Sequence, residues 1–127
     1  IPLKRQNINL VLEGMNAVVN EPIGVAYASR FRDKNLSFGG KTGSAQVRRI
    51  SKQERDEGVR KNEEKPWIER DHALFVGYGP VDNPRYAVSV IVEHGGGGAV
   101  KAAPIVKDVL EYMFAQDLKK KPDGGDA

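Results

Sequence analysis

Two apolar segments joined by a very short turn set the strongest limit on how this chain of 127 residues can fold. Residues 72–78 and 85–93 are rich in Val, Ile, Phe and Tyr, which favour strands. The connection at residues 80–84 reads Pro-Val-Asp-Asn-Pro and is typical of a turn. Because parallel strands need a long crossover, these two strands are predicted to pair antiparallel.

Both faces of the strand at residues 85–93 are largely apolar. One face carries Tyr86, Val88, Val90 and Val92, and the other carries Ala87, Ser89 and Ile91. A strand that is apolar on both faces is typically buried on both, so we expect two layers to cover this one.

A third strand is predicted at residues 36–47. Gly39, Gly40 and Gly43 interrupt it, and glycines inside a strand mark places where a ligand or another backbone comes close.

Helices are predicted at both ends of the chain. In residues 7–20, Asn7 is a candidate N-cap, residues 21–24 end the helix at a proline, and apolar residues recur at helical spacing: Ile8, Val11, Leu12, Met15, Val18 and Val19. A second helix is predicted from about Ala102, after the glycines at 95–98, with Pro104 in its first turn. Its buried stripe would be Ile105, Val106, Val109, Leu110, Met113 and Phe114.

The predicted order of helix, three strands and helix gives an α/β (α+β) fold, with an antiparallel sheet flanked by helices that pack on one face. Residues 1–118 are assigned to this unit, and residues 119–127 to a flexible tail. The first residues, Ile1 and Pro2, lead us to expect a piece of a longer protein, with a processed mature protein as the alternative.

Residues 48–71 differ from the rest, because about fifteen of them are charged, with both signs present. Ser51 and Glu54 form a capping-box pattern that predicts a short helix. Trp67 and Ile68 indicate that the far end returns to the core, although Trp67 contacting a substrate is an alternative. The segment is interpreted as a mobile flap, and binding of a partner protein is the other possibility.

Composition excludes several functions. The chain has no cysteine, so it offers neither a catalytic thiolate nor a disulfide. Its net charge of +3 is spread without a basic stripe, which argues against nucleic acid binding. His72 and His94 are expected at strand ends in structural roles, and we expect no metal site and no cofactor. No apolar run approaches the ~20 residues that cross a bilayer.

Residues 39–46 carry the chemistry. Lys41 places a positive charge beside Thr42, whose hydroxyl can hold a carboxylate, and Gly43 lets a substrate lie against the backbone. The backbone N–H of Ser44 could then stabilise an oxyanion. A phosphate-binding loop is the alternative, but its pattern requires a glycine where Asn35 stands.

Several segments in order resemble one family: Gly14-Met15, residues 40–46, 71–78, 83–88, 92–96 and 102–104. The family is the penicillin-binding protein transpeptidases, most closely the penicillin-binding protein 2 type, whose third motif is Lys-Thr-Gly. The resemblance covers roughly residues 8–115. It implies part of a penicillin-binding protein and serine β-lactamase-like fold.

The resemblance further implies a peptidoglycan D,D-transpeptidase that works through an acyl-serine intermediate. Thr42 and Gly43 would bind the D-Ala-D-Ala end of a stem peptide, or a β-lactam that mimics it. Lys41 would assist electrostatics and proton transfer, and the Ser44 N–H would form half of the oxyanion hole. Expected partners are the rest of the domain and proteins of the elongation complex, at the periplasmic face of the inner membrane.

Two departures from the family pattern matter. The position after Lys-Thr-Gly is more often Thr, and here it is Ser44. The chain also lacks the Ser-x-x-Lys nucleophile motif, because the residues three positions after its serines are Arg32, Gly40, Val47, Glu54 and Val92. Alternatives on the same fold are a D,D-carboxypeptidase or β-lactamase, and another class is a non-catalytic β-lactam sensor.

Overall fold

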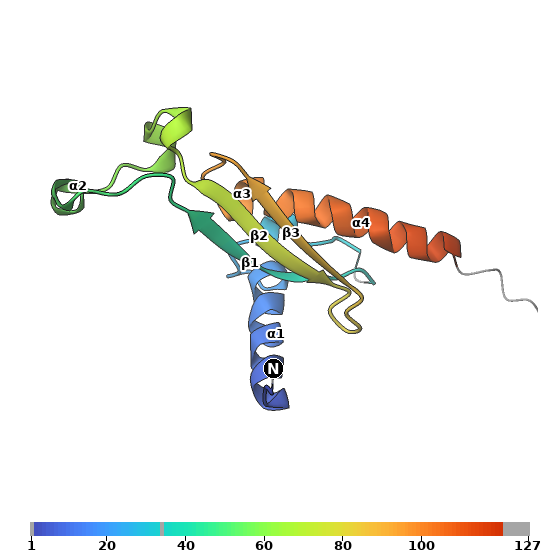
Figure 1. Ribbon diagram of the computed structural model, residues 1–127. Coiled ribbons are helices and arrows are strands. Elements are labelled where there is room, and N and C mark those ends of the chain that lie inside the picture. Colours follow the sequence, from blue (N-terminus) through green and yellow to red (C-terminus); the bar gives the residue numbers. More distant parts are fainter. Residues whose placement is uncertain (1, 34, 121–127) are drawn as a thin grey trace, which may run out of the picture.

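The computed structural model describes residues 2–33 and 35–120 and has the predicted α+β architecture. A three-stranded sheet lies beside two long helices, with a charged excursion extending from one end (Figure 1). The main elements are α1 (Arg5–Asn20), β1 (Gly39–Ala45), α2 (Lys52–Glu57), β2 (His72–Gly79), β3 (Tyr86–Val92), α3 (Gly98–Lys101) and α4 (Ala103–Lys120). One 3-10 turn follows α1 (Tyr27–Ser29) and two lie in the excursion (Asn62–Glu64 and Trp67–Glu69).

The sheet has the order β1-β2-β3, and both neighbouring pairs are antiparallel. The short turn at residues 80–84 therefore joins paired strands, as predicted. In the centre of the register, Phe75 lies opposite Thr42 on one side and Val90 on the other. β2 is the central strand and β1 is an edge strand, shorter than the predicted residues 36–47.

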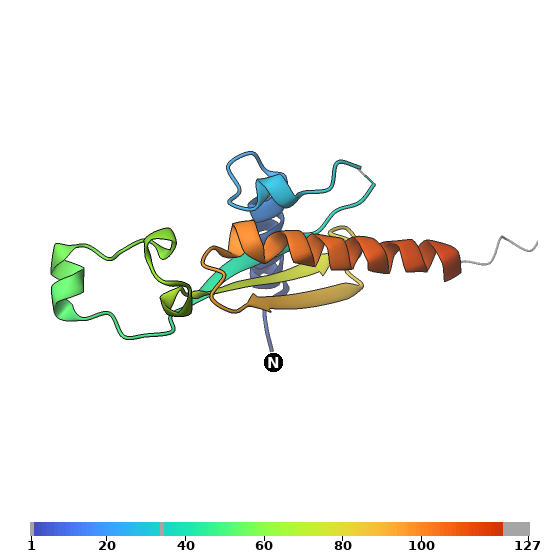
Figure 2. The ribbon, with the colours of Figure 1, turned by 90° about the horizontal axis from the view of Figure 1, so that it is seen from above.

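One face of the sheet is packed under α4, which lies along β2 and β3 (Figure 2). Phe75 of β2 is fully buried there with Val106 and Leu110 of α4. The predicted stripe of α4 is only partly correct, because Ile105 and Val109 are 42% and 39% exposed. These two residues lie beside the buried set on the helix surface, where the narrow sheet does not reach them.

The opposite face is open at β3, so the prediction that β3 is covered on both sides is wrong for the described residues. Val76 of β2 is 45% exposed and Ile91 of β3 is 61% exposed. The apolar residues of β3 show that both of its faces would gain from burial, but α4 covers only one of them. No described element covers these two side chains.

α1 runs past the edge strand β1 and joins the core under α4 with its last turn, so the prediction that both end helices pack on one face is only partly correct. Its last turn reaches the core through buried Val19, and the Asn20 side chain donates to the carbonyl of Phe38 (Nδ2–O 2.9 Å). Earlier in the helix, the Tyr78 hydroxyl donates to the carbonyl of Leu12 (3.1 Å).

The helix ends differ from the predictions in detail. α1 begins at Arg5, so Asn7 lies inside the helix and does not cap it, and no side chain caps this end. Pro104 lies in the first turn of α4, as predicted, but the short helix α3 precedes it. Lys119 and Lys120 belong to α4, and the rest of the predicted tail lies outside the described residues.

Gly40 is a position where two elements meet with no room for a side chain. A Cβ placed there would overlap the Phe75 ring and lie 2.6 Å from the Val76 carbonyl oxygen. Gly14 on α1 is the opposite case, because a Cβ there would have nothing within 4 Å.

We predict that G40A and G14A change stability in opposite directions. G40A should lower the free energy of unfolding by about 1–3 kcal/mol, because Phe75 and the strand must move apart. G14A should raise it by about 0.5–1 kcal/mol, since alanine favours a helix interior. Urea unfolding of the purified protein measures both, and equal effects would contradict the close approach at Gly40.

Candidate functional site at the sheet edge

The residues singled out by the sequence lie together on β1, extended, as predicted. β1 pairs with β2 along one side only, so its other side is an open strand edge. Gly39 and Gly40 are buried, whereas Lys41 and Ser44 are exposed and Thr42 and Gly43 are half-buried. The run from Lys41 to Ser44 is therefore accessible to a ligand.

Lys41 and Thr42 are joined by hydrogen bonds at this edge. The Lys41 ammonium donates to the carbonyl oxygen of Thr42 (3.0 Å) and to its hydroxyl oxygen (3.2 Å). Successive residues of a strand point to opposite faces, so the long lysine side chain must fold back toward its neighbour. A positive charge and a hydroxyl group consequently stand side by side, and both can donate hydrogen bonds to a carboxylate.

Gly98, which the sequence analysis treated only as part of a turn, supports this strand from behind. A Cβ on Gly98 would lie 3.0 Å from the carbonyl oxygen of Gly43 and would overlap the carbonyl oxygen of Leu74. The start of α3 can therefore press against β1 and β2 only because residue 98 has no side chain. The run of four glycines was the available signal, since close backbone contact requires glycine as much as a turn does.

The charged excursion leaves the sheet directly after β1 and returns at β2 (Figure 1). The predicted capping box is present, because the Glu54 amide donates to the Ser51 hydroxyl and the Ser51 amide donates to the Glu54 carboxylate. Arg48 clamps the same carboxylate at 2.6 Å and approaches Glu69 at 3.5 Å. These contacts tie the outer helix α2 to the returning arm of the excursion.

The returning arm is anchored, but by other residues than expected. The prediction that Trp67 and Ile68 dock on the core is wrong, because they are 61% and 68% exposed. Instead Lys65 is buried and lies 3.8 Å from the Asp71 carboxylate. A long aliphatic stem can be buried while its ammonium meets a carboxylate, which is why a lysine replaces the expected apolar anchor.

His72 and His94 meet where β2 begins and β3 ends. The His94 amide donates to Nδ1 of His72 (2.9 Å), and Nδ1 of His94 lies 3.0 Å from the carbonyl of Arg70. The Trp67 ring packs on His94, with ring centres 4.6 Å apart. Both histidines thus have the structural positions predicted, and within residues 2–33 and 35–120 no group of His, Asp and Glu could hold a metal ion.

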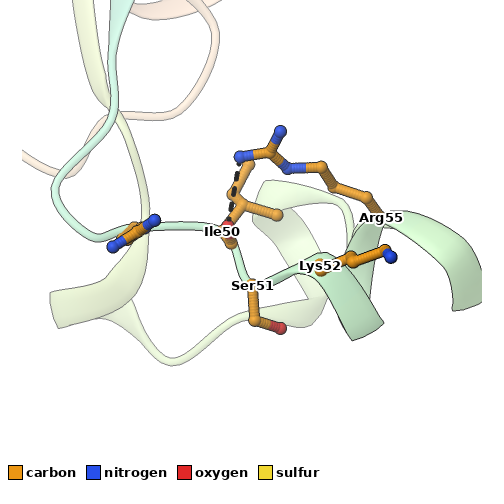
Figure 3. Close-up of a pocket in the computed structure, with 5 residues that line it drawn as sticks. Ile50, Ser51, Lys52 and Arg55 are labelled. Atoms are coloured by element: carbon orange, nitrogen blue, oxygen red, sulfur yellow. Dashed lines mark hydrogen bonds between the residues drawn. The ribbon is translucent and has the colours of Figure 1, made fainter.

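One hollow of the described surface lies on the excursion and not on β1. It has a volume of about 610 Å³ and is lined by Arg49, Ile50, Ser51, Lys52 and Arg55 (Figure 3). The figure shows the Arg55 side chain turned back, with its guanidinium donating to the carbonyl of Ile50 (3.4 Å).

Comparison with known proteins agrees with this geometry. The family model described as penicillin binding protein transpeptidase domain matches residues 1–111. The peptidoglycan D,D-transpeptidase MrdA of Haemophilus influenzae is 38% identical over 107 residues, which is 83% of this chain and 15% of that protein.

Solved structures give the same result. Penicillin-binding protein PBP2 of Helicobacter pylori, in its complex with MreC, has a TM-score of 0.71 and 26% identity, covering 91% of this chain and 19% of that one. Pseudomonas aeruginosa PBP2 in complex with WCK 5153 has a TM-score of 0.66 and 34% identity, covering 89% of this chain and 21% of that one.

An antiparallel sheet with a Lys-Thr-Gly edge strand and flanking helices defines a piece of a penicillin-recognising domain. The chain belongs to the penicillin-binding protein transpeptidase domain family. It spans less than a quarter of the length of the relatives it matches. Among the residues described, no helix combines the length and apolar character of a membrane span.

The Arg48 and Glu54 pair gives a pH prediction. Hydrogen bonds from Arg48 and from the Ser51 amide lower the pKa of Glu54 from 4.5 to about 2. The stabilising effect of this depressed pKa is complete above pH 4.5 and is lost as the pH falls through 2. We expect an NMR titration of the Glu54 side-chain carboxyl to show a midpoint near 2.

Two variants test the cause of this shift. R48M should raise the Glu54 midpoint toward 4.5, because it removes the largest contribution. R55M is the matched control and should leave it unchanged, since Arg55 contacts Ile50 and not Glu54. A midpoint near 4.5 in the folded wild-type protein would contradict the clamp.

Proposed function

We propose that this chain forms one wall of the active site of a serine-type peptidoglycan D,D-transpeptidase. The observation that supports the proposal most directly is the open edge of β1, where Lys41 donates to the hydroxyl of Thr42. Membership of the transpeptidase family supplies the reaction class. Extended peptides bind to open strand edges through backbone hydrogen bonds, which suits a stem peptide.

In this proposal Thr42 binds the terminal carboxylate of the substrate, with Lys41 supplying positive charge next to it. Gly43 leaves room for the peptide, and the Ser44 N–H forms half of the oxyanion hole. In an antiparallel pair, the backbone N–H and C=O groups of every second residue point away from the partner strand. Because the Thr42 carbonyl accepts a bond from Lys41 at the edge, Ser44, two residues on, would share this outward direction.

The reaction is an acyl transfer in two steps. A serine hydroxyl outside this chain attacks the carbonyl of the penultimate D-Ala and loses its proton, while the terminal D-Ala leaves with a protonated amine. An amine of a neighbouring stem peptide then takes the acyl group and frees the serine. Lys41 would stabilise developing charge and assist proton transfer, and no cofactor or metal ion takes part.

The rest of the domain is the first proposed partner, because this chain has no Ser-x-x-Lys motif. The exposed apolar side chains of Val76 and Ile91 provide a surface that it could cover. We assign residues 1–118 to this domain and extend to this chain the elongation-complex partnership of the Helicobacter pylori relative with MreC. The site of action would be the periplasmic face of the inner membrane.

Two other functions on the same fold are separable by experiment. A D,D-carboxypeptidase or β-lactamase would pass the acyl group to water, so a β-lactamase would turn over penicillin and a transpeptidase would remain acylated. A non-catalytic β-lactam sensor would become acylated but would not cross-link stem peptides. The 38% sequence identity to a peptidoglycan D,D-transpeptidase favours cross-linking.

We predict that Thr42 contributes through its hydroxyl. T42V in the complete enzyme should reduce the second-order rate of acylation by a β-lactam about 10- to 100-fold, as expected for a lost hydrogen bond to a charged group. T42S keeps the hydroxyl and should stay within a few fold of wild type. An unchanged rate in T42V, which keeps the methyl group of Thr42 and removes only its hydroxyl, would contradict this role.

We also predict that these 127 residues alone do not react with a fluorescent penicillin, because the nucleophile lies elsewhere. The complete enzyme should be labelled under the same conditions. Gel fluorescence of the two samples measures this, and a labelled band from the isolated chain would refute the assignment of the nucleophile.

A further inference from the structure

Three cations surround the hollow on the excursion. Arg49, Lys52 and Arg55 are exposed and line it together with Ser51 and the half-buried Ile50 (Figure 3). The lining therefore combines positive charge with an apolar patch, which suits a carboxylate carried on an aliphatic chain.

Within residues 2–33 and 35–120, these cations form no ion pair, in contrast to their neighbours. Arg48, Arg60 and Lys65 form ion pairs with Glu54, Glu69 and Asp71. The described ion pairs include none with Arg49, Lys52 or Arg55. Three like charges held around one hollow repel each other and raise its positive potential, which an anion would relieve.

The position of the hollow indicates which anion it meets. In the proposed binding mode, the substrate carboxylate lies at Thr42 and the reacting carbonyl at Ser44. The substrate chain traced back from its C-terminus therefore runs along β1 toward Ala45, and Arg49 follows four residues later. Extended chains advance about 3.3 Å per residue, so a few substrate residues reach the start of the excursion.

We propose that Arg49, Lys52 and Arg55 bind a side-chain carboxylate of the substrate peptide, on the residues that precede its D-Ala-D-Ala end. This inference rests on the proposed function and extends it to substrate selection. The excursion is then a specificity element, whereas the β1 edge holds the reacting end. An acidic segment of another protein is the competing occupant.

The test compares two synthetic peptides that end in D-Ala-D-Ala. One carries a free side-chain carboxylate two to four residues before the C-terminus, and the other has the matching amide. With the complete enzyme we expect the KM for the acid to be about five- to tenfold lower, in line with a few exposed charge contacts. Salt raised from about 50 to about 500 mM should remove this preference, because exposed charges are screened.

Variants identify the residues responsible for the preference for the acidic peptide. R49Q/K52Q/R55Q should lose it, and R60Q should keep it, because Arg60 is paired with Glu69 and does not line the hollow. Equal KM values for the two peptides with the wild-type enzyme, or a preference that survives in the triple variant, would overturn the inference and leave the hollow to another anion. Failure of the wild-type enzyme to be acylated by penicillin would instead overturn the proposed function.

Discussion

The open edge of β1 is the constraint on which the candidate site depends. β1 is held in place from one side, through its pairing with β2 and through glycines that let it approach its neighbours closely. Gly40 lies against Phe75, whose ring is in the core under α4. Gly43 in turn lies under Gly98 at the start of α3. The position of the Lys-Thr-Gly run is thus set by packing behind it, while its front remains free.

The sequence predicted the sheet better than its surroundings. The five-residue turn allowed only antiparallel pairing, so the arrangement of β2 and β3 followed from chain length. Which faces are covered did not follow, because Ile91 has the same apolar character whether a second layer is present or not. The start of α1 was also missed, since Asn7 has the right chemistry for a cap but the helix begins earlier without one.

In the candidate site, the sequence likewise predicted residues that are adjacent in the chain and missed a contact between residues that are far apart in it. Lys41, Thr42, Gly43 and Ser44 were found because their motif is contiguous in sequence. Gly98 was not, because its contact with Gly43 joins positions far apart in the chain. The anchor of the excursion was misassigned to Trp67 for a related reason: burial of Lys65 depends on Asp71 and on the folded arm around it, which no local pattern reveals.

An open strand edge normally favours association with other chains, and proteins commonly protect such edges with lysine. Lys41 stands on this edge, and its ammonium is bonded to the carbonyl of the next residue. A stem peptide that adds to β1 would satisfy the same backbone groups, while its carboxylate would take the ammonium and the Thr42 hydroxyl. The substrate would therefore exchange an intramolecular bond of Lys41 for an ionic one, whereas a neutral strand could offer no such exchange. In the proposed function, Lys41 would both discourage uncontrolled strand pairing and select peptides that end in a carboxylate.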